Sequence, residues 1–95
     1  MSVQEPVRAY LLIIGRVQGV AYRAFAREEA TLRGVGGWVR NREDGRVEVE
    51  VEGERAVVEA FIECLKHGPP LARIDHVEIQ WMAANRQETN FRILY

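Results

Sequence analysis

Residues 44–53 read DGRVEVEVEG, and this segment predicts a β-strand in the middle of a sheet. Its valines alternate strictly with its glutamates, which is the two-residue period of a strand that buries one face. The Asp-Gly pair that opens the segment is a strong signal for a hairpin turn between two strands. We therefore expect a strand whose valines enter the core and whose glutamates, Glu48, Glu50, Glu52 and Glu54, meet water.

The chain before this segment contains two further strands and a helix. An apolar-rich run at 7–14 predicts a central strand that is covered on both faces. Residues 22–33 lack Gly and Pro, and their alanines and aromatic residues favour a helix that Gly34 ends. A strand is also expected at 36–42, directly before the hairpin turn.

The chain after the segment continues with a helix and a strand. Apolar residues recur at helical spacing over 54–67, and Gly68-Pro69-Pro70 ends that helix. Apolar residues alternate with polar ones through Val77, Ile79 and Trp81, which predicts a strand at 74–81. The polar stretch 84–90 then separates this strand from a short final strand at 91–95.

The element order is therefore β-α-β-β-α-β with one short added strand. Right-handed crossovers place both helices of such a chain on one face of its sheet. We predict an α+β, ferredoxin-like two-layer sandwich with a mainly antiparallel sheet. No repeat or linker indicates a second unit, so we expect residues 1–95 to form a single domain that buries its own core.

Composition narrows the class of function. Charged residues make up 28% of the chain and apolar residues 47%, as in ordinary globular proteins. The formal net charge of −1 gives no general attraction to nucleic acid or to a lipid surface, so any anion site must be local. The single cysteine, Cys64, excludes an intrachain disulfide and fits a reducing compartment. With no signal peptide and no bilayer-spanning run, we expect a cytoplasmic protein.

The segment GRVQGVAYR at 15–23 predicts an anion site between the first strand and the first helix. Glycines let several backbone N–H groups converge, and the helix N-terminus adds unpaired N–H groups and the positive end of its dipole. The positive charge of Arg23 in the first helical turn interacts unfavourably with the positive end of that dipole. A bound dianion would reverse the sign of the local field and make the arginine favourable there. A phosphate fits these features best.

The expected topology brings a second residue to the same place. The first two strands run in the same direction, so their C-terminal ends lie on one rim of the sheet, about 10 Å apart with the third strand between them. Asn41, at the end of the second strand, is therefore expected close to the loop that leaves the first strand. A long arginine side chain and a protruding loop span much of that distance.

Other chemistry-bearing residues have simpler explanations. Strict alternation makes the glutamates of the third strand a solvated face rather than a metal or acid–base cluster. His67 precedes the glycine that ends the second helix, and we expect it to cap that helix. His76 has no Cys or His at ligand spacing, and Cys64 is expected to be a small apolar filler. We expect no metal site.

Four motifs together resemble the acylphosphatase family over nearly the whole chain. They are GRVQGVAYR at 15–23, GWVRN at 37–41, DGRVEVEVEG at 44–53 and GPPLARIDHV at 68–77. The resemblance implies hydrolysis of acyl phosphates to a carboxylate and inorganic phosphate, with no metal, cofactor or covalent intermediate. The chain departs from the family pattern at Tyr22, where Phe is more usual, and at Arg33, where an apolar residue is common.

The same resemblance implies roles for individual residues. Arg23 matches the phosphate-binding arginine of the family, and Asn41 matches the asparagine that orients the attacking water. Backbone N–H groups of the preceding loop bind the phosphate, and that loop consists of Arg16, Val17, Gln18, Gly19, Val20, Ala21 and Tyr22. The implied partners are a small-molecule acyl phosphate and inorganic phosphate, the product and a competitive inhibitor. No nucleic acid or membrane partner is implied, and we expect a monomer.

The residue types suit this chemistry. A carboxylate is a weak base that leaves without being protonated, so the site needs no general acid. A guanidinium and converging N–H groups stabilise charge on the phosphate oxygens. An amide can hold a water molecule through both its oxygen and its nitrogen.

Three alternatives share parts of this pattern. A ferredoxin-like domain can bind an anion as a sensing or regulatory module without catalysis. An assay of benzoyl phosphate hydrolysis distinguishes such a module from an enzyme. A similar domain begins a hydrogenase-maturation carbamoyltransferase, but we expect no further domain after Tyr95. An RNA-recognition module has the same element order, yet it needs exposed aromatic residues where the third strand carries glutamates.

Overall fold

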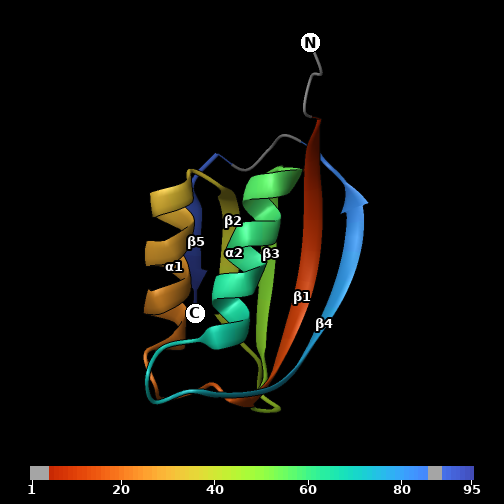
Figure 1. Ribbon diagram of the computed structural model, residues 1–95. Helices are drawn as coiled ribbons and strands as arrows, with labels where there is room; N and C mark the ends of the chain where they lie inside the picture. The colour runs from red at the N-terminus through yellow and green to blue at the C-terminus, as the bar shows by residue number, and fades with distance from the viewer. Residues whose placement is uncertain (1–4, 86–88) are drawn as a thin grey trace.

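The computed structural model describes residues 5–85 and 89–95, and it places two helices on one face of a five-stranded sheet (Figure 1). The elements are β1 (Pro6–Arg16), α1 (Tyr22–Arg33), β2 (Gly36–Asn41), β3 (Val47–Glu54), α2 (Arg55–His67), β4 (Arg73–Ala83) and β5 (Phe91–Leu94). Neither of these helices is long and apolar enough to cross a membrane. Their order confirms the prediction, although β1 and β4 are longer than expected. Part of the polar stretch 84–90 lies outside the described residues.

The sheet has the strand order β4-β1-β3-β2-β5. β1 pairs antiparallel with β3 and β4, β2 pairs antiparallel with β3, and β2 pairs parallel with β5. This is the ferredoxin-like α+β sandwich that the sequence predicts. The loop after β1 and the turn after β2 lie at the same end of the sheet, the lower end in Figure 1.

The valines of β3 lie at the centre of the core. Val49 is fully buried and stands opposite Leu11 on β1 and Val39 on β2. The helices add a layer of buried residues: Tyr22, Ala26 and Ala30 from α1, and Val58, Phe61, Ile62 and Leu65 from α2. Burying a Val or Leu side chain contributes about 1.5–3 kcal/mol, so this layer holds β1 and β2 firmly against β3.

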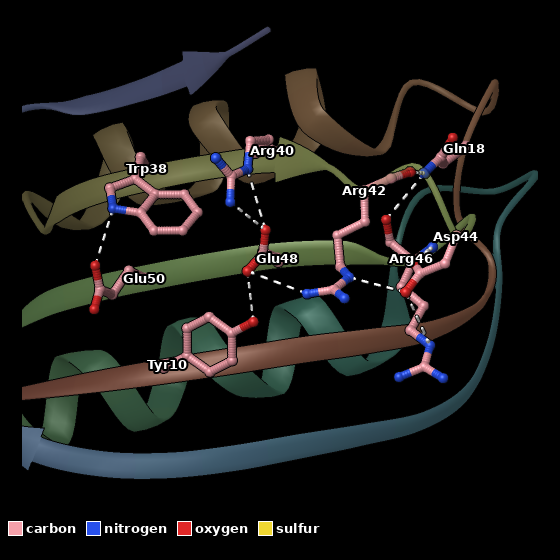
Figure 2. Close-up of polar contacts among 9 residues, drawn as sticks. All are labelled: Tyr10, Gln18, Trp38, Arg40, Arg42, Asp44, Arg46, Glu48 and Glu50. Carbon is pink, nitrogen blue, oxygen red and sulfur yellow. Dashed lines mark hydrogen bonds and ion pairs between the residues drawn. The ribbon is translucent and has the colours of Figure 1, made fainter.

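The glutamate face of β3 does not meet water as expected. Glu48 and Glu52 are each only 6% exposed, and Glu50 is half-buried, while Glu54 is exposed. No helix covers this face, but long side chains from β1 and β2 lie across it, as Figure 2 shows. Alternation along one strand cannot reveal this cover, because the cover comes from neighbouring strands.

Hydrogen bonds from two neighbouring strands compensate for the burial of Glu48. Its carboxylate accepts a hydrogen bond of 2.6 Å from the Tyr10 hydroxyl and another of 2.6 Å from Nη2 of Arg40. Burial alone would raise the pKa of Glu48, but these two donors outweigh it and hold that pKa below its ordinary value. Glu48 therefore stays charged inside the network.

Arg8 plays the corresponding part at the other end of β3. Its guanidinium is buried and pairs with Glu50 at 2.8 Å and with Glu52 at 3.2 Å. Nε1 of Trp38 donates a further hydrogen bond of 3.0 Å to Glu50. This face of β3 thus presents carboxylates tied to arginines, and not the exposed aromatic residues that an RNA-recognition module uses.

Candidate active site

The loop from 17 to 21 has a strained backbone between β1 and α1. The pairing of β1 with β4 shifts by one residue between Ile14 and Gly15, and a Cβ added at Gly15 would lie 2.0 Å from the carbonyl oxygen of Arg73. Gly19 and Ala21 both have a left-handed backbone, with φ of 74° and 63°. In the described ranges of the chain, Ala21 is the one non-glycine residue with positive φ. Such strain is typical of functional loops.

Unpaired N–H groups run through this loop into the helix. Within the described residues, no backbone N–H from 18 to 24 donates a hydrogen bond, and the first helical bond joins the Phe25 N–H to the Ala21 carbonyl at 3.0 Å. Val20 lies between two left-handed residues without being left-handed itself, and such alternation is typical of backbone segments whose successive N–H groups converge on an anion. The positive end of the α1 dipole lies at the same place, and both features favour an anion.

Arg23 and Asn41 line one pocket of about 200 Å³ together with this loop. This confirms that the topology brings Asn41 close to the loop after β1. The pocket is smaller than typical ligand pockets of about 300–1,000 Å³, so it fits a phosphoryl group rather than a whole substrate. Ile93 and Tyr95 also line it, because β5 pairs in parallel with β2 and ends beside Asn41. The sequence pattern predicts a strand here but does not predict that these two residues line the pocket.

Asn41 carries an unsatisfied acceptor in this pocket. Its side-chain oxygen Oδ1 is buried and has no hydrogen-bond partner among the residues that the structure describes. Leaving a buried acceptor unpaired costs about 1–3 kcal/mol, and a water molecule or a ligand donor in the pocket would remove that cost.

Arg23 carries an uncompensated positive charge at the start of α1. It makes no ion pair with the described residues, and the first turn of the helix contains no acidic residue. Its Cζ lies 5.0 Å from the centroid of the Tyr95 ring, which is a cation–π contact. The guanidinium and the helix dipole therefore add to a positive potential at the pocket.

Tyr22 anchors the beginning of α1 to the end of α2. Its side chain is 1% exposed, and its hydroxyl donates a hydrogen bond of 2.7 Å to the carbonyl oxygen of Leu65. Burial raises the pKa of this phenol well above its ordinary value. The aromatic anchor expected from the sequence is present. Its hydroxyl partner comes from a distant helix and could not be predicted.

The side chains of the other loop residues either pack into the core or lie away from the pocket. Val17 and Val20 bury their side chains in the core, which fixes the loop on the sheet. Arg16 belongs to β1, where it pairs with Arg73, and its exposed side chain does not line the pocket. The Gln18 side chain does not line the pocket either, and it contacts the turn between β2 and β3.

The two histidines lie outside this pocket. Nδ1 of His67 lies 3.0 Å from the carbonyl oxygen of Glu63, at the C-terminal end of α2 where a cap was expected. His76 is exposed on β4, with Nε2 at 3.9 Å from a carboxylate oxygen of Glu78. Cys64 is half-buried on α2.

Fold and pocket define a small α+β sandwich protein whose pocket, at one end of the sheet, is lined by a loop with unpaired N–H groups. Comparison with known proteins narrows this class, because the family model described as Acylphosphatase matches residues 9–93. An acylphosphatase of Anaeromyxobacter dehalogenans is 57% identical over 78 residues, or 82% of this chain and 84% of the relative. An acylphosphatase of Pyrobaculum islandicum is 50% identical over 91 residues, or 95% of this chain and 96% of the relative.

Solved structures agree with the sequence comparison. The crystal structure of acylphosphatase from Bacillus subtilis matches with a TM-score of 0.91 at 35% identity, covering 94% of this chain and 99% of that chain. The chain belongs to the acylphosphatase family, and its activity is the hydrolysis of acyl phosphates. Full-length HypF also matches with a TM-score of 0.84 at 29% identity, over 99% of this chain and 12% of that chain. The same fold therefore also occurs as one part of a much longer protein.

Proposed function

We propose that the loop amides and Arg23 hold the phosphoryl group of an acyl phosphate while Asn41 orients the water that attacks it. The observation that carries this proposal is the meeting of three unsatisfied groups at one pocket: backbone amides without acceptors, a guanidinium without an ion pair, and the Asn41 oxygen without a donor. A phosphate dianion accompanied by a water molecule satisfies all three groups at once.

The reaction is an in-line displacement at phosphorus. The water oxygen bonds to phosphorus as the bond between phosphorus and the acyl oxygen breaks, and the electron pair of that bond leaves with the carboxylate. Both protons of the water stay with the phosphate product, so an acyl phosphate dianion and water give a carboxylate and dihydrogen phosphate. No proton has to be supplied to the leaving group.

Each group of the site has a distinct part in this displacement. The guanidinium of Arg23 stays protonated at any working pH and can donate two parallel hydrogen bonds to non-bridging phosphate oxygens. The loop amides donate to the same oxygens from a rigid backbone, so little reorganisation is needed as charge develops. Asn41 accepts a hydrogen bond from the water through Oδ1 and so aligns the water with phosphorus.

The acyl group of the substrate extends into a wider pocket next to the cradle that the loop amides and Arg23 form. This pocket has a volume of about 640 Å³ and shares Asn41 and Tyr95 with the phosphate pocket. Its other walls are Arg40, Arg42, Glu43, Asp44 and Glu48. Since Arg40 pairs with Glu48 and Arg42 pairs with Asp44, neither arginine offers a free charge to the acyl group. We infer that the phosphoryl group carries most of the recognition and that acyl groups of varied shape are accepted.

We further infer that residues 1–95 act as one domain, as a monomer, in the cytoplasm. The single cysteine and the net charge of −1 support a reducing compartment and a function without nucleic acid or membrane partners. Light scattering coupled to size-exclusion chromatography tests the monomer, and a dimeric mass would contradict it.

Hydrolysis of benzoyl phosphate in the presence of inorganic phosphate tests the proposed roles. The wild-type protein should turn over this substrate, and inorganic phosphate should compete with it because both occupy the cradle. Arg23→Gln should lose turnover and phosphate inhibition together. Purely non-competitive inhibition by phosphate would contradict the assignment of the cradle.

A further inference from the structure

Gln18 belongs to the phosphate loop, but its side chain reaches the turn between β2 and β3 (Figure 2). Its amide nitrogen Nε2 donates to the carbonyl oxygen of Arg42 at 2.7 Å and to that of Arg46 at 2.9 Å. Both hydrogens of the amide nitrogen are therefore used. The opposite orientation of the amide would set its oxygen against two carbonyl oxygens, so the two acceptors determine which way it points.

This contact joins the two halves of the proposed site. The loop follows β1 and Asn41 ends β2, but β3 lies between these strands, so no sheet hydrogen bond joins them directly. Among the described residues, the hydrogen bonds of Gln18 are the ones that join the loop at 17–21 to the turn at 42–46. Gln18 adjoins Gly19 of the cradle and Arg42 adjoins Asn41, so each end of the contact lies next to a group of the site.

The turn that Gln18 contacts is itself well supported. The Arg42 N–H donates to the Arg46 carbonyl at 2.8 Å, and the Asp44 carboxylate accepts from the Arg46 N–H at 3.1 Å. Nε of Arg42 also donates to Asp44 at 3.0 Å. These contacts hold the turn without help from the loop. The hydrogen bonds of Gln18 therefore attach the strained loop at 17–21 to a turn that is already fixed.

We propose that Gln18 is a positioning residue for the hydrolysis, because its side-chain amide sets the distance between the phosphate cradle and Asn41. This inference rests on the proposed roles of the loop amides and of Asn41. A misplacement of about 1 Å between reacting groups can cost roughly 100-fold in rate. Loss of the two Gln18 hydrogen bonds should therefore lower turnover strongly. The stability of the fold should fall only slightly, because this side chain does not enter the core.

Two substitutions of similar size separate this role from simple packing. Gln18→Met keeps the length of the side chain and removes both donors. Gln18→Glu places a carboxylate against two carbonyl oxygens, which repel it and raise its pKa above the ordinary value of about 4.3. Once protonated, that carboxyl can donate one hydrogen bond to the turn and so replace one of the two that Gln18 donates.

The experiment measures kcat and KM for benzoyl phosphate from pH 5 to 8, corrected for spontaneous hydrolysis, with folding checked by circular dichroism. We expect Gln18→Met to lose about 10- to 100-fold in kcat at every pH. The rate of Gln18→Glu, divided by that of Gln18→Met, should rise at least about threefold toward pH 5 as its carboxyl is protonated. The arginines of the facing turn, Arg42 and Arg46, are both paired with Asp44, and all three groups are common to both variants, so their own titration cancels in this ratio.

The exposed residue Gln80 on β4 supplies the matched control, because Gln80→Glu adds the same charge away from the site. Its pH profile should follow the wild type. A wild-type kcat in Gln18→Met, or a ratio of the two variants that stays flat with pH, would overturn the role of Gln18. Failure of the wild-type protein to hydrolyse benzoyl phosphate would instead overturn the proposed function, so the two failures are distinguishable.

Discussion

Arg23 and Asn41 line the same pocket although one begins α1 and the other ends β2. The arginine contributes a positive charge without an ion-pair partner in the described structure, and the asparagine contributes a buried oxygen without a donor. The two side chains differ in what they can do: one attracts a dianion, and the other holds a neutral water molecule. Their removal should therefore change different kinetic quantities.

Removal of the Asn41 amide should slow turnover and spare phosphate binding. We expect Asn41→Ala to lower kcat by on the order of 100-fold, as loss of a preorganised hydrogen-bonding group does in other active sites. The inhibition constant of inorganic phosphate should change by less than about threefold, because the loop amides and Arg23 remain. Steady-state kinetics with benzoyl phosphate measures both quantities. Weaker phosphate inhibition with an unchanged kcat would contradict the water-orienting role.

Replacement of Arg23 should show that its shape matters as well as its charge. Arg23→Ala should lose about 10²-fold or more in kcat/KM, since a charged donor to the phosphate oxygens is removed. Arg23→Lys keeps the charge but loses the planar fork, so it should recover only part of this loss. Arg27→Lys, at an exposed position one turn further along α1, is the control and should behave as wild type. Full activity in Arg23→Lys would argue against a bidentate contact.

Much of the fold follows from local pattern. The alternation in β3, the helical spacing of the apolar residues in α2, and the Asp44-Gly45 turn are set by neighbours in the chain, and all three are present in the structure. The proximity of Asn41 to the phosphate loop could also be predicted, because it follows from strand direction and order alone.

Contacts across several strands could not be predicted in this way. Glu48 is buried because Tyr10 and Arg40 come over it from β1 and β2, which a single strand does not encode. The same holds for Tyr95, which reaches Arg23 because β5 pairs with β2 at the far edge of the sheet. A polar residue in the sequence indicates that its side chain needs hydrogen-bond or ion-pair partners. Only the packing of distant elements determines which residues those partners are.

The Tyr22 hydroxyl should stabilise the fold without acting in the reaction. Tyr22→Phe leaves the buried Leu65 carbonyl without this donor, and we expect the free energy of unfolding to fall by about 1–2 kcal/mol. Activity at 25 °C should stay within about twofold, because the role proposed for this residue uses its backbone N–H, which the substitution leaves in place. Urea denaturation and benzoyl phosphate assays check the two outcomes. A large loss of kcat at unchanged stability would mean that the hydroxyl takes part in the chemistry.

The buried network around Glu48 should make stability depend on pH. Because hydrogen bonds hold its folded pKa below the ordinary value of 4.5, Glu48 stabilises the fold above that value, and the contribution disappears as pH falls through the folded pKa. Glu48→Gln should be less stable than wild type by about 1–3 kcal/mol at pH 7. The difference should shrink between pH 5 and pH 3.

Urea denaturation at several pH values measures this difference. Glu28→Gln on the exposed face of α1 is the control and should show little change at any pH. A Glu48→Gln deficit that stays constant down to pH 3 would show that the carboxylate contributes no more when charged than when neutral.

Titration of the ¹⁵N-labelled protein with inorganic phosphate tests the central claim most directly, because it reports on the backbone amides themselves. The amides from 18 to 24, which have no acceptor in the described structure, should shift together. Their shifts should saturate with a dissociation constant equal to the competitive inhibition constant of phosphate. If phosphate inhibits the enzyme while these amides stay unchanged and others shift, the loop is not the phosphate cradle.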